Sequence, residues 1–241
     1  PAWDWIKAKP GENPYNGPDY YEKMERDRQV NGEVWMQRFY EGNWEAFEGQ
    51  RFPMFDRNRH VSKAVLRPTS EHIVIEGYDF GHGETFVSWL AYLPSAREPV
   101  IVFAELQAQD VMEPSQVAEA VFAIRKQYGV VHPICLGDPA GVGASQFSSV
   151  SPIGAYEALG IYIGPCKDGK LPQPRADRLT EFLAGEHRMY DGTVWPGIVF
   201  SPNCPATVNS IIGLRWKRKK NVLGEDPREV FLKKDDHGFD A

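Results

Sequence analysis

The sequence lacks long apolar runs, paired cysteines and any excess of positive charge. None of its 241 residues lie in an apolar stretch near the roughly 18 residues that a membrane span requires. Cys135, Cys166 and Cys204 lie far apart, which excludes a paired zinc spacing or a disulfide framework and fits a reducing compartment. The net charge of −6 argues against a general polyanion-binding surface. We expect a soluble protein that meets any nucleic acid through a local basic patch or metal ions.

A signal peptide, an initiator methionine and an internal repeat are also missing. The first residue is Pro1, and Ala241 follows an apparent helix start with no glycine or proline to end it. We therefore expect a piece of a longer polypeptide, cut at both ends.

A functional phosphate-binding loop is absent as well. The stretch "GPCKDGKL" at 164–171 has the glycine and lysine frame, but Leu171 replaces the hydroxyl that would bind Mg²⁺. Pro172 and Pro174 oppose the helix that should follow at once. We interpret this stretch as a strand-exit loop and expect any ATPase to lie upstream of Pro1.

Two regions differ in pattern. Residues 1–65 hold a Pro/Gly/Asn-rich stretch and one amphipathic helix within "YYEKMERDRQVNGEVWMQRFY", which predicts an appendage or linker. From about Ser70, residues 66–241 alternate strands and helices. "HIVIEGYDFG", "TFVSWLAYL" and "VIVFAEL" predict three meandering strands, "EPSQVAEAVFAIRKQYG" a crossover helix, and "VVHPICLGDPAG" a fourth strand. This order predicts an α/β fold with a mixed central sheet flanked by helices.

The rest of the chain continues the alternation. We expect a helix around "IGAYEALG", a strand "IYIGP", a helix "PRADRLTEFLAG", a hairpin through "MYDGTVWPGIVFSP", a helix "CPATVNSIIGLRW" and a short strand "EVFLKK". The chain then ends in "DDHGFDA".

Carboxylates occur at three places where an active site could form. Asp79 and Asp138 each follow an apolar strand and precede a glycine-containing turn. Either one alone is an ordinary turn residue. If the sheet brings the first and fourth strands together, both carboxylates lie at one edge.

The terminal cluster adds the third place. In a helix starting near Asp236, the spacing of Asp236, His237 and Asp240 lets all three approach one face. Alone, this cluster would fit a solvated charge run or a helix cap. Clustered carboxylates repel unless a cation lies between them, and Mg²⁺ and Mn²⁺ prefer oxygen ligands. Together, the three places predict a two-metal phosphodiesterase site.

"GYDFG", "LGDPAG" and "DDHGFDA" resemble the three acidic motifs of the nuclease domain in the large terminase subunit of tailed bacteriophages. "EGNWEAFEGQRFPMFDRNRHV" resembles the connection from that family's ATPase domain, and residues 1–42 the end of that ATPase. The resemblance covers about residues 43–241. It implies a ribonuclease H-like nuclease domain, truncated here in its C-terminal helix, that cuts concatemeric double-stranded DNA with two Mg²⁺ or Mn²⁺ ions.

The resemblance also implies site residues and a setting. Asp79, Asp138 and Asp240 would ligate metal, with Asp236 and His237 adjacent, while the choice between Asp235 and Asp236 stays open. His237 would ligate, orient a water or transfer a proton. The implied partners are the portal protein and the small terminase subunit, and the implied location is the cytoplasm of the infected bacterium and, transiently, the procapsid portal.

Two basic stretches are candidates for DNA contact through the backbone, without sequence readout. One is "LRWKRKKN", for which a solvated helix end is the equal alternative; the other is "KDGKLPQPRADR". Their members are Arg215, Trp216, Lys217, Arg218, Lys219 and Lys220 in the first, and Lys167, Lys170, Arg175 and Arg178 in the second.

Three alternatives stay open at this stage. "DFGHGET" and "DPAGVG" would suit an ATP-binding protein of the actin and sugar-kinase type, which has no use for the terminal cluster. A resolvase or transposase-like nuclease would share the fold but not the terminase-like connection. A non-catalytic scaffold would leave the three acidic places unexplained.

Overall fold

The structure is a computed structural model that describes residues 13–31, 50–80, 85–94, 98–108, 113–143, 150–166, 172–188, 192–217 and 230–232, with Gly238 and Ala241. Its centre is a six-stranded mixed sheet in the order β5-β4-β1-β2-β3-β8. The first three strands form an antiparallel meander, and β4, β5 and β8 join it in parallel. The bounds are β1 Ile73–Phe80, β2 Thr85–Tyr92, β3 Val100–Ala108, β4 Ile134–Gly137, β5 Gly164–Pro165 and β8 Ile198–Phe200.

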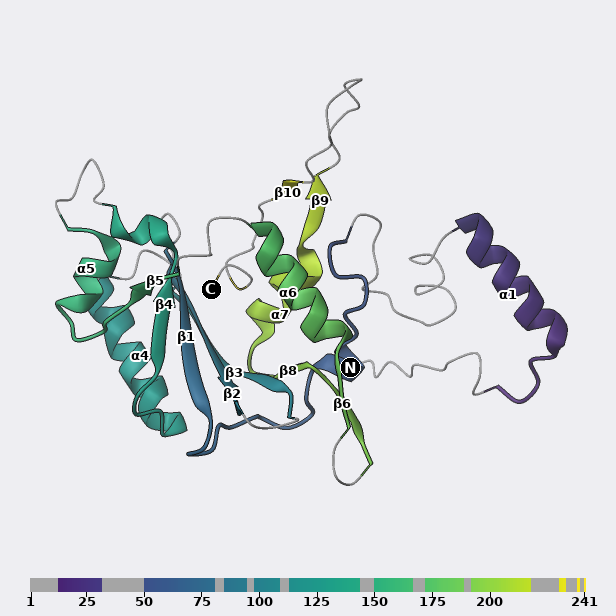
Figure 1. Ribbon diagram of the computed structural model, residues 1–241, viewed down its shortest axis with the longest axis horizontal. Coiled ribbons are helices and arrows are strands. Elements are labelled where there is room, and N and C mark those ends of the chain that lie inside the picture. Colours follow the sequence, from purple (N-terminus) through teal and green to yellow (C-terminus); the bar gives the residue numbers. More distant parts are fainter. Residues whose placement is uncertain are drawn as a thin grey trace, which may run out of the picture.

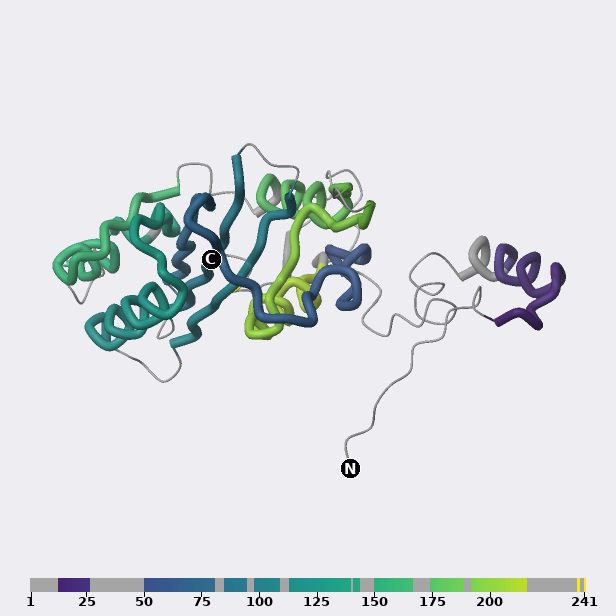
Figure 2. Tube along the Cα trace, turned by 90° about the horizontal axis from the view of Figure 1, so that it is seen from below, coloured from purple at the N-terminus to yellow at the C-terminus, as the bar shows by residue number. Residues whose placement is uncertain are grey.

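Helices cover both faces of this sheet (Figures 1 and 2). On one face lie α4 (Pro114–Tyr128) and α5 (Pro152–Glu157), and on the other lie α6 (Pro172–Ala184) and α7 (Pro205–Gly213). α4 begins at a proline and ends at Gly129, whose φ of 68° is the left-handed conformation that favours glycine at a helix end. The predicted crossover helix is confirmed.

Two hydrophobic clusters correspond to the two faces. The first joins Trp89 and Phe103 of the sheet to Val117 and Val121 of α4. The second joins Phe200 to Leu183 of α6 and Ile211 of α7, together with Phe52 and Phe55 from the segment before the first strand. Residues 50–61 therefore pack on the body of the fold.

That segment holds a buried histidine. His60 ends the short helix α3 (Arg57–His60); its Nδ1 accepts from the Asp56 backbone N–H at 3.0 Å, and its Nε2 donates to the Leu183 carbonyl at 3.0 Å. Burial lowers the pKa of His60, although the nearby backbone carbonyls of Leu183 and Asp56 act in the opposite direction. The neutral ring thus joins the segment to α6.

The structure shortens or regroups several predicted elements. Only Ile134–Gly137 of "VVHPICLGDPAG" and Gly164–Pro165 of "IYIGP" pair in the sheet. The expectation that Pro172 and Pro174 oppose a helix is wrong, because α6 begins at Pro172 and proline is tolerated in the first turn of a helix. A hairpin is formed by β6 (Glu186–Arg188) and β7 (Val194–Pro196). Its first strand precedes the predicted stretch 189–202, and β8, from the second half of that stretch, extends the main sheet beside β3. Near the N-terminus, α1 (Pro18–Asn31) begins two residues before the predicted amphipathic helix at 20–40 and covers its first part. Among the described helices, none has the length and apolarity to cross a bilayer.

Candidate metal centre

The carboxyl ends of β1 and β4 bring Asp79 and Asp138 to the same edge of the sheet. The two strands pair in parallel from Ile75 opposite Ile134 to Tyr78 opposite Gly137. Extending this register by one residue sets Asp79 opposite Asp138, and the backbone N–H of Asp138 donates to the Tyr78 carbonyl at 3.3 Å. Residues opposite one another in parallel strands project to the same face. The juxtaposition that the sequence analysis required of these strands is present.

Glycines form the turn that carries Asp138. The backbone N–H of Gly141 donates to the Asp138 carbonyl at 2.9 Å in a short 3₁₀ turn, η2 (Pro139–Val142). A Cβ at Gly137 or Gly141 would come within 2.9 or 2.6 Å of the Phe80 ring. The absence of these side chains lets the residue after Asp79 pack against the turn that holds Asp138.

The end of the chain reaches the same face of β1. A Cβ added at Gly77 would overlap the carbonyl oxygen of Ala241 and lie 2.7 Å from its carbonyl carbon. Gly238 is buried against α7, where an added Cβ would lie 2.7 Å from the Cα of Thr207 and 3.0 Å from the Ser210 hydroxyl. Two close approaches at glycines thus place the described part of "DDHGFDA" between α7 and β1. Asp235, Asp236, His237 and Asp240 lie outside the described residues.

α7 is itself fixed to the sheet at its N-terminus. The Glu105 carboxylate on β3 accepts from the backbone N–H groups of Ala206 and Thr207 at 2.9 and 2.7 Å. A carboxylate here satisfies N–H groups that have no partner within the helix and is favoured by the helix dipole. β3 therefore sets the position of the helix on which Gly238 rests.

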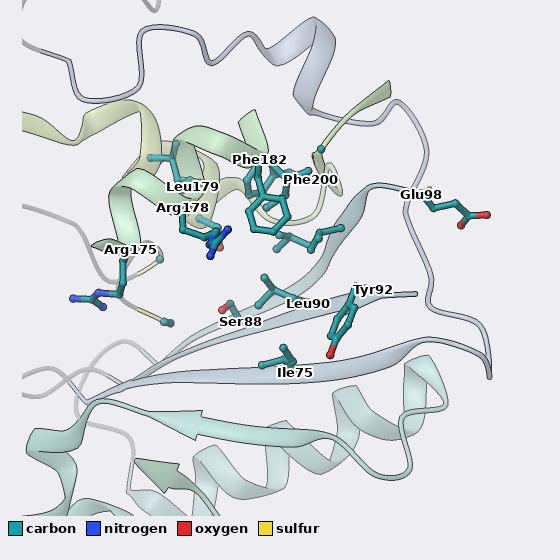
Figure 3. Close-up of a pocket in the computed structure, with 18 of the residues that line it drawn as sticks. Ile75, Ser88, Leu90, Tyr92, Glu98, Arg175, Arg178, Leu179, Phe182 and Phe200 are labelled. Carbon is teal, nitrogen blue, oxygen red and sulfur yellow. The ribbon is translucent and has the colours of Figure 1, made fainter. Parts of the chain in front are cut away.

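A small cavity of about 170 Å³ lies where these parts meet, lined by Gly77, Asp138, Cys166, Arg175 and Ala241, among others. A larger cavity of about 960 Å³ lies between the sheet and α6 and α7 and also reaches Ala241. In Figure 3, Arg175 and Arg178 both project from α6 above the strands. Arg175 thus borders the same small cavity as Asp138.

The donor chemistry of this edge fits hard divalent cations. Asp79 and Asp138 are half-buried carboxylates, the ligand type that Mg²⁺ and Mn²⁺ prefer. Across the described ranges, no group of three or more His, Cys, Asp or Glu side chains is arranged to hold a metal ion. Of the predicted ligands, Asp79 and Asp138 lie within the described residues, and the others lie within 235–240.

The basic candidates are divided between different elements. Arg175 and Arg178 lie on α6, whereas Arg215, Trp216 and Lys217 form β9 (Arg215–Lys217), paired with β10 (Val230–Leu232). The predicted helix through Trp216 is wrong in this part, because α7 ends at Gly213 and the basic run begins as a strand. A solvated helix end is therefore no longer the alternative for its described members. Lys167, Lys170, Arg218, Lys219 and Lys220 lie outside the described residues.

Two residues of β1 have structural roles that were not predicted from the sequence. Gly77 interrupts an apolar strand, which is a signal for close backbone approach. Glu76 is a charged residue inside the apolar part of the same strand and is completely buried, a position that requires partners. Both signals are visible in "HIVIEGYDFG".

Solved structures share this architecture. The large terminase of a thermophilic bacteriophage aligns over 97% of this chain and 52% of its own, with 16% identity and a TM-score of 0.60. The P22 large terminase nuclease domain aligns over 80% of this chain and 89% of its own, with 14% identity and a TM-score of 0.57. The fold is that of a phage large-terminase nuclease domain.

This result confirms the predicted ribonuclease H-like class with its mixed central sheet. The g2p (large terminase) nuclease domain of bacteriophage SPP1, solved with bound Mn, aligns over 76% of this chain and 92% of its own, with 16% identity and a TM-score of 0.50. The chain spans about half the length of the thermophilic phage's large terminase. No protein-family model and no curated protein sequence matches it.

Proposed function

We propose that this chain is the nuclease part of a viral DNA-packaging large terminase and cuts concatemeric double-stranded DNA by metal-dependent hydrolysis. The supporting observation is that Asp79, Asp138 and the end of the "DDHGFDA" segment meet at one edge of a terminase nuclease fold. By this proposal, residues 66–241 form the nuclease domain and residues 1–65 lead into it from an upstream ATPase. Residues 50–61 then connect the two while packing on the nuclease core.

The proposed ligands are Asp79, Asp138 and Asp240, with Asp236 adjacent. When bound, two Mg²⁺ or Mn²⁺ ions would lower the pKa of the attacking water and stabilise the leaving 3′ oxygen. Asp79 and Asp138 would fix where the ions lie relative to the sheet, because Asp79 lies at the end of β1, Asp138 directly follows β4, and the two strands pair in register. His237 would orient the water or transfer its proton.

Arg175 is the proposed contact to the phosphate next to the scissile bond, because it lines the small cavity together with Asp138. Arg178, three residues further along α6, would meet a neighbouring phosphate; Arg215 and Lys217 on β9 would contact the backbone elsewhere. Such contacts carry no sequence information, so cleavage would be set by the packaging machinery. The proposed partners are the portal protein and the small terminase subunit, in the host cytoplasm and at the procapsid.

The test is nicking of supercoiled plasmid in Mn²⁺, in Mg²⁺ and in EDTA. We expect metal-dependent nicking by the unaltered chain and its loss in Asp138→Ala. Asp19→Ala is the matched control, because Asp19 is an exposed aspartate on α1. Circular dichroism shows whether each variant is folded.

Nicking that survives in Asp138→Ala would remove this aspartate from the site. Absence of nicking by the folded, unaltered chain in both metals would contradict the proposal for this chain, and ATP titration would then test the actin-like alternative. Equal loss in Asp19→Ala would show that the assay reports stability rather than the site.

A further inference from the structure

Behind the metal-site face of β1 lies a buried charge network that the proposed chemistry does not use. Side chains alternate along this strand, so Gly77 and Asp79 face the metal site while Glu76 and Tyr78 face α4. Glu76 has no exposed surface, and Arg125 of α4 is only 15% exposed. Such a pair is costly to bury unless every polar atom finds a partner.

Both carboxylate oxygens of Glu76 are fully engaged. Oε1 accepts from Arg125 Nε at 2.8 Å and from Trp89 Nε1 at 2.7 Å. Oε2 accepts from Arg125 Nη2 at 2.6 Å, from the Tyr78 hydroxyl at 2.9 Å and, more weakly, from the Cys135 thiol at 3.4 Å. The Arg125 guanidinium thus binds the Glu76 carboxylate through two parallel hydrogen bonds, which fix the orientation of the two groups as well as the distance between them.

The partners come from both neighbouring strands at one level of the sheet. Trp89 of β2 and Cys135 of β4 are the residues directly opposite Glu76. Arg125 Nη2 also donates to the Cys135 sulfur at 3.3 Å. One carboxylate therefore ties β1 to β2, to β4 and to α4.

The register of β4 needs this support. β4 has only four residues, and Gly137 alone among them is buried, so the hydrophobic pattern specifies its pairing weakly. A slip of one residue would separate Cys135 from Glu76 and Asp138 from its place opposite Asp79. The network lies three residues before both aspartates, about 10 Å along the strands.

We propose that the Glu76–Arg125 pair is the positioning device of the metal site: it holds β1 and β4 in the register that juxtaposes Asp79 and Asp138. The inference rests on the proposed function, because the aspartates are the proposed metal ligands. Arg125 and Glu76 touch neither metal nor substrate and act only through the two strands. Burial and the nearby Glu76 charge raise the pKa of the Cys135 thiol to about 12, so Cys135 stays a neutral member of the network at physiological pH.

The test measures Mn²⁺ affinity by electron paramagnetic resonance or calorimetry, apart from any cleavage assay. The first variant is the double substitution Glu76→Leu with Arg125→Met, which removes both charges and leaves no unpaired ion in the core. We expect its Kd for Mn²⁺ to rise roughly tenfold or more, the usual effect of losing groups that orient ligands. Glu76→Gln, which keeps the size of the side chain, is expected to raise the Kd for Mn²⁺ in the same way. If the double variant does not fold, the affinity of Glu76→Gln tests the positioning role.

Val117→Ala is the matched control. Val117 is fully buried on the same helix as Arg125 but makes no hydrogen bond in the network, so its truncation lowers stability while the Glu76 contacts stay in place. We expect its Kd for Mn²⁺ to stay within twofold of the unaltered chain. Folded network variants with unchanged affinity would overturn the positioning role. Failure of the unaltered, folded chain to bind Mn²⁺ would instead overturn the proposed function.

Discussion

Substitution of Gly77 by alanine tests how the end of the chain is placed on β1. The added methyl group would overlap the Ala241 carbonyl oxygen and lie 2.7 Å from the carbonyl carbon, whereas two carbons pack best at about 3.5–4.0 Å. The Ala241 backbone therefore has to retreat by about 1 Å or more. The strand itself tolerates the change, because alanine is favoured over glycine within a strand by roughly 0.5–1 kcal/mol.

A displacement of this size has a large effect at an active site and a small one on the fold. A 1 Å misplacement costs roughly 100-fold in rate, which is about 2.7 kcal/mol of transition-state stabilisation. If only the terminal segment moves, the change in unfolding free energy stays below about 1 kcal/mol and the Tm shifts by less than about 4 °C. We therefore expect Gly77→Ala to cut plasmid about 100-fold more slowly while remaining folded.

The measurement is initial nicking rate in Mn²⁺, with Tm determined on the same preparations. Gly164→Ala is the control, because Gly164 lies in β5 of the same sheet and an added Cβ there would meet its nearest atom at 3.7 Å, an ordinary contact. A folded Gly77→Ala protein that cuts within twofold of the unaltered chain would refute the reasoning.

Three further predictions follow from other parts of the molecule. Saturating Mn²⁺, at about 100 times its Kd, should stabilise the chain by about 2.7 kcal/mol and raise Tm by roughly 5–10 °C. In Asp138→Ala the rise in Tm should largely vanish. A Tm of the unaltered chain that does not change with Mn²⁺ concentration would count against the metal site. Burial lowers the pKa of His60 below 6.5, so the unfolded chain binds the proton more readily than the folded chain, and the stability of the protein should fall as the pH drops below 6.5. This fall should be less steep in His60→Gln than in the control His132→Gln, which replaces an exposed histidine. Equal slopes in the two variants would contradict the prediction. Arg175→Ala should weaken DNA binding in EDTA and reduce its logarithmic salt slope by about 1, whereas Arg67→Ala, an exposed arginine hydrogen-bonded to the Gln127 carbonyl, should leave the slope unchanged.

The sequence predicted the sheet well because its strands carry strong local signals. The apolar runs around Val87 and Phe103 and the proline and glycine that bound α4 are visible without any tertiary information. The same logic predicted Asp79 and Asp138 at strand ends, since a strand exit is also a local feature. Whether β1 and β4 would be neighbours was a condition that only the fold could supply.

The remaining features depend on tertiary contacts. Ile198–Phe200 is too short to show whether it stays in a hairpin or joins the main sheet, and its pairing with β3 decides this. The basic run after Gly213 has no periodicity of its own, and its partner Val230–Leu232 determines that it begins as a strand. Glu76 and Gly77 carried local signals, but their partners Arg125 and Ala241 lie far away in the sequence.

The contact between Ala241 and Gly77 has a consequence for synthesis of the protein. It closes a loop that contains nearly all of the sheet, and such distant contacts form late because the loop has to be ordered first. A nascent chain on the ribosome can therefore form β1 to β4 and juxtapose Asp79 with Asp138 before the third acidic place has been translated. Under the proposed function, a phage gains a safeguard from this order: a partly made nuclease cannot cut the DNA that it is meant to package.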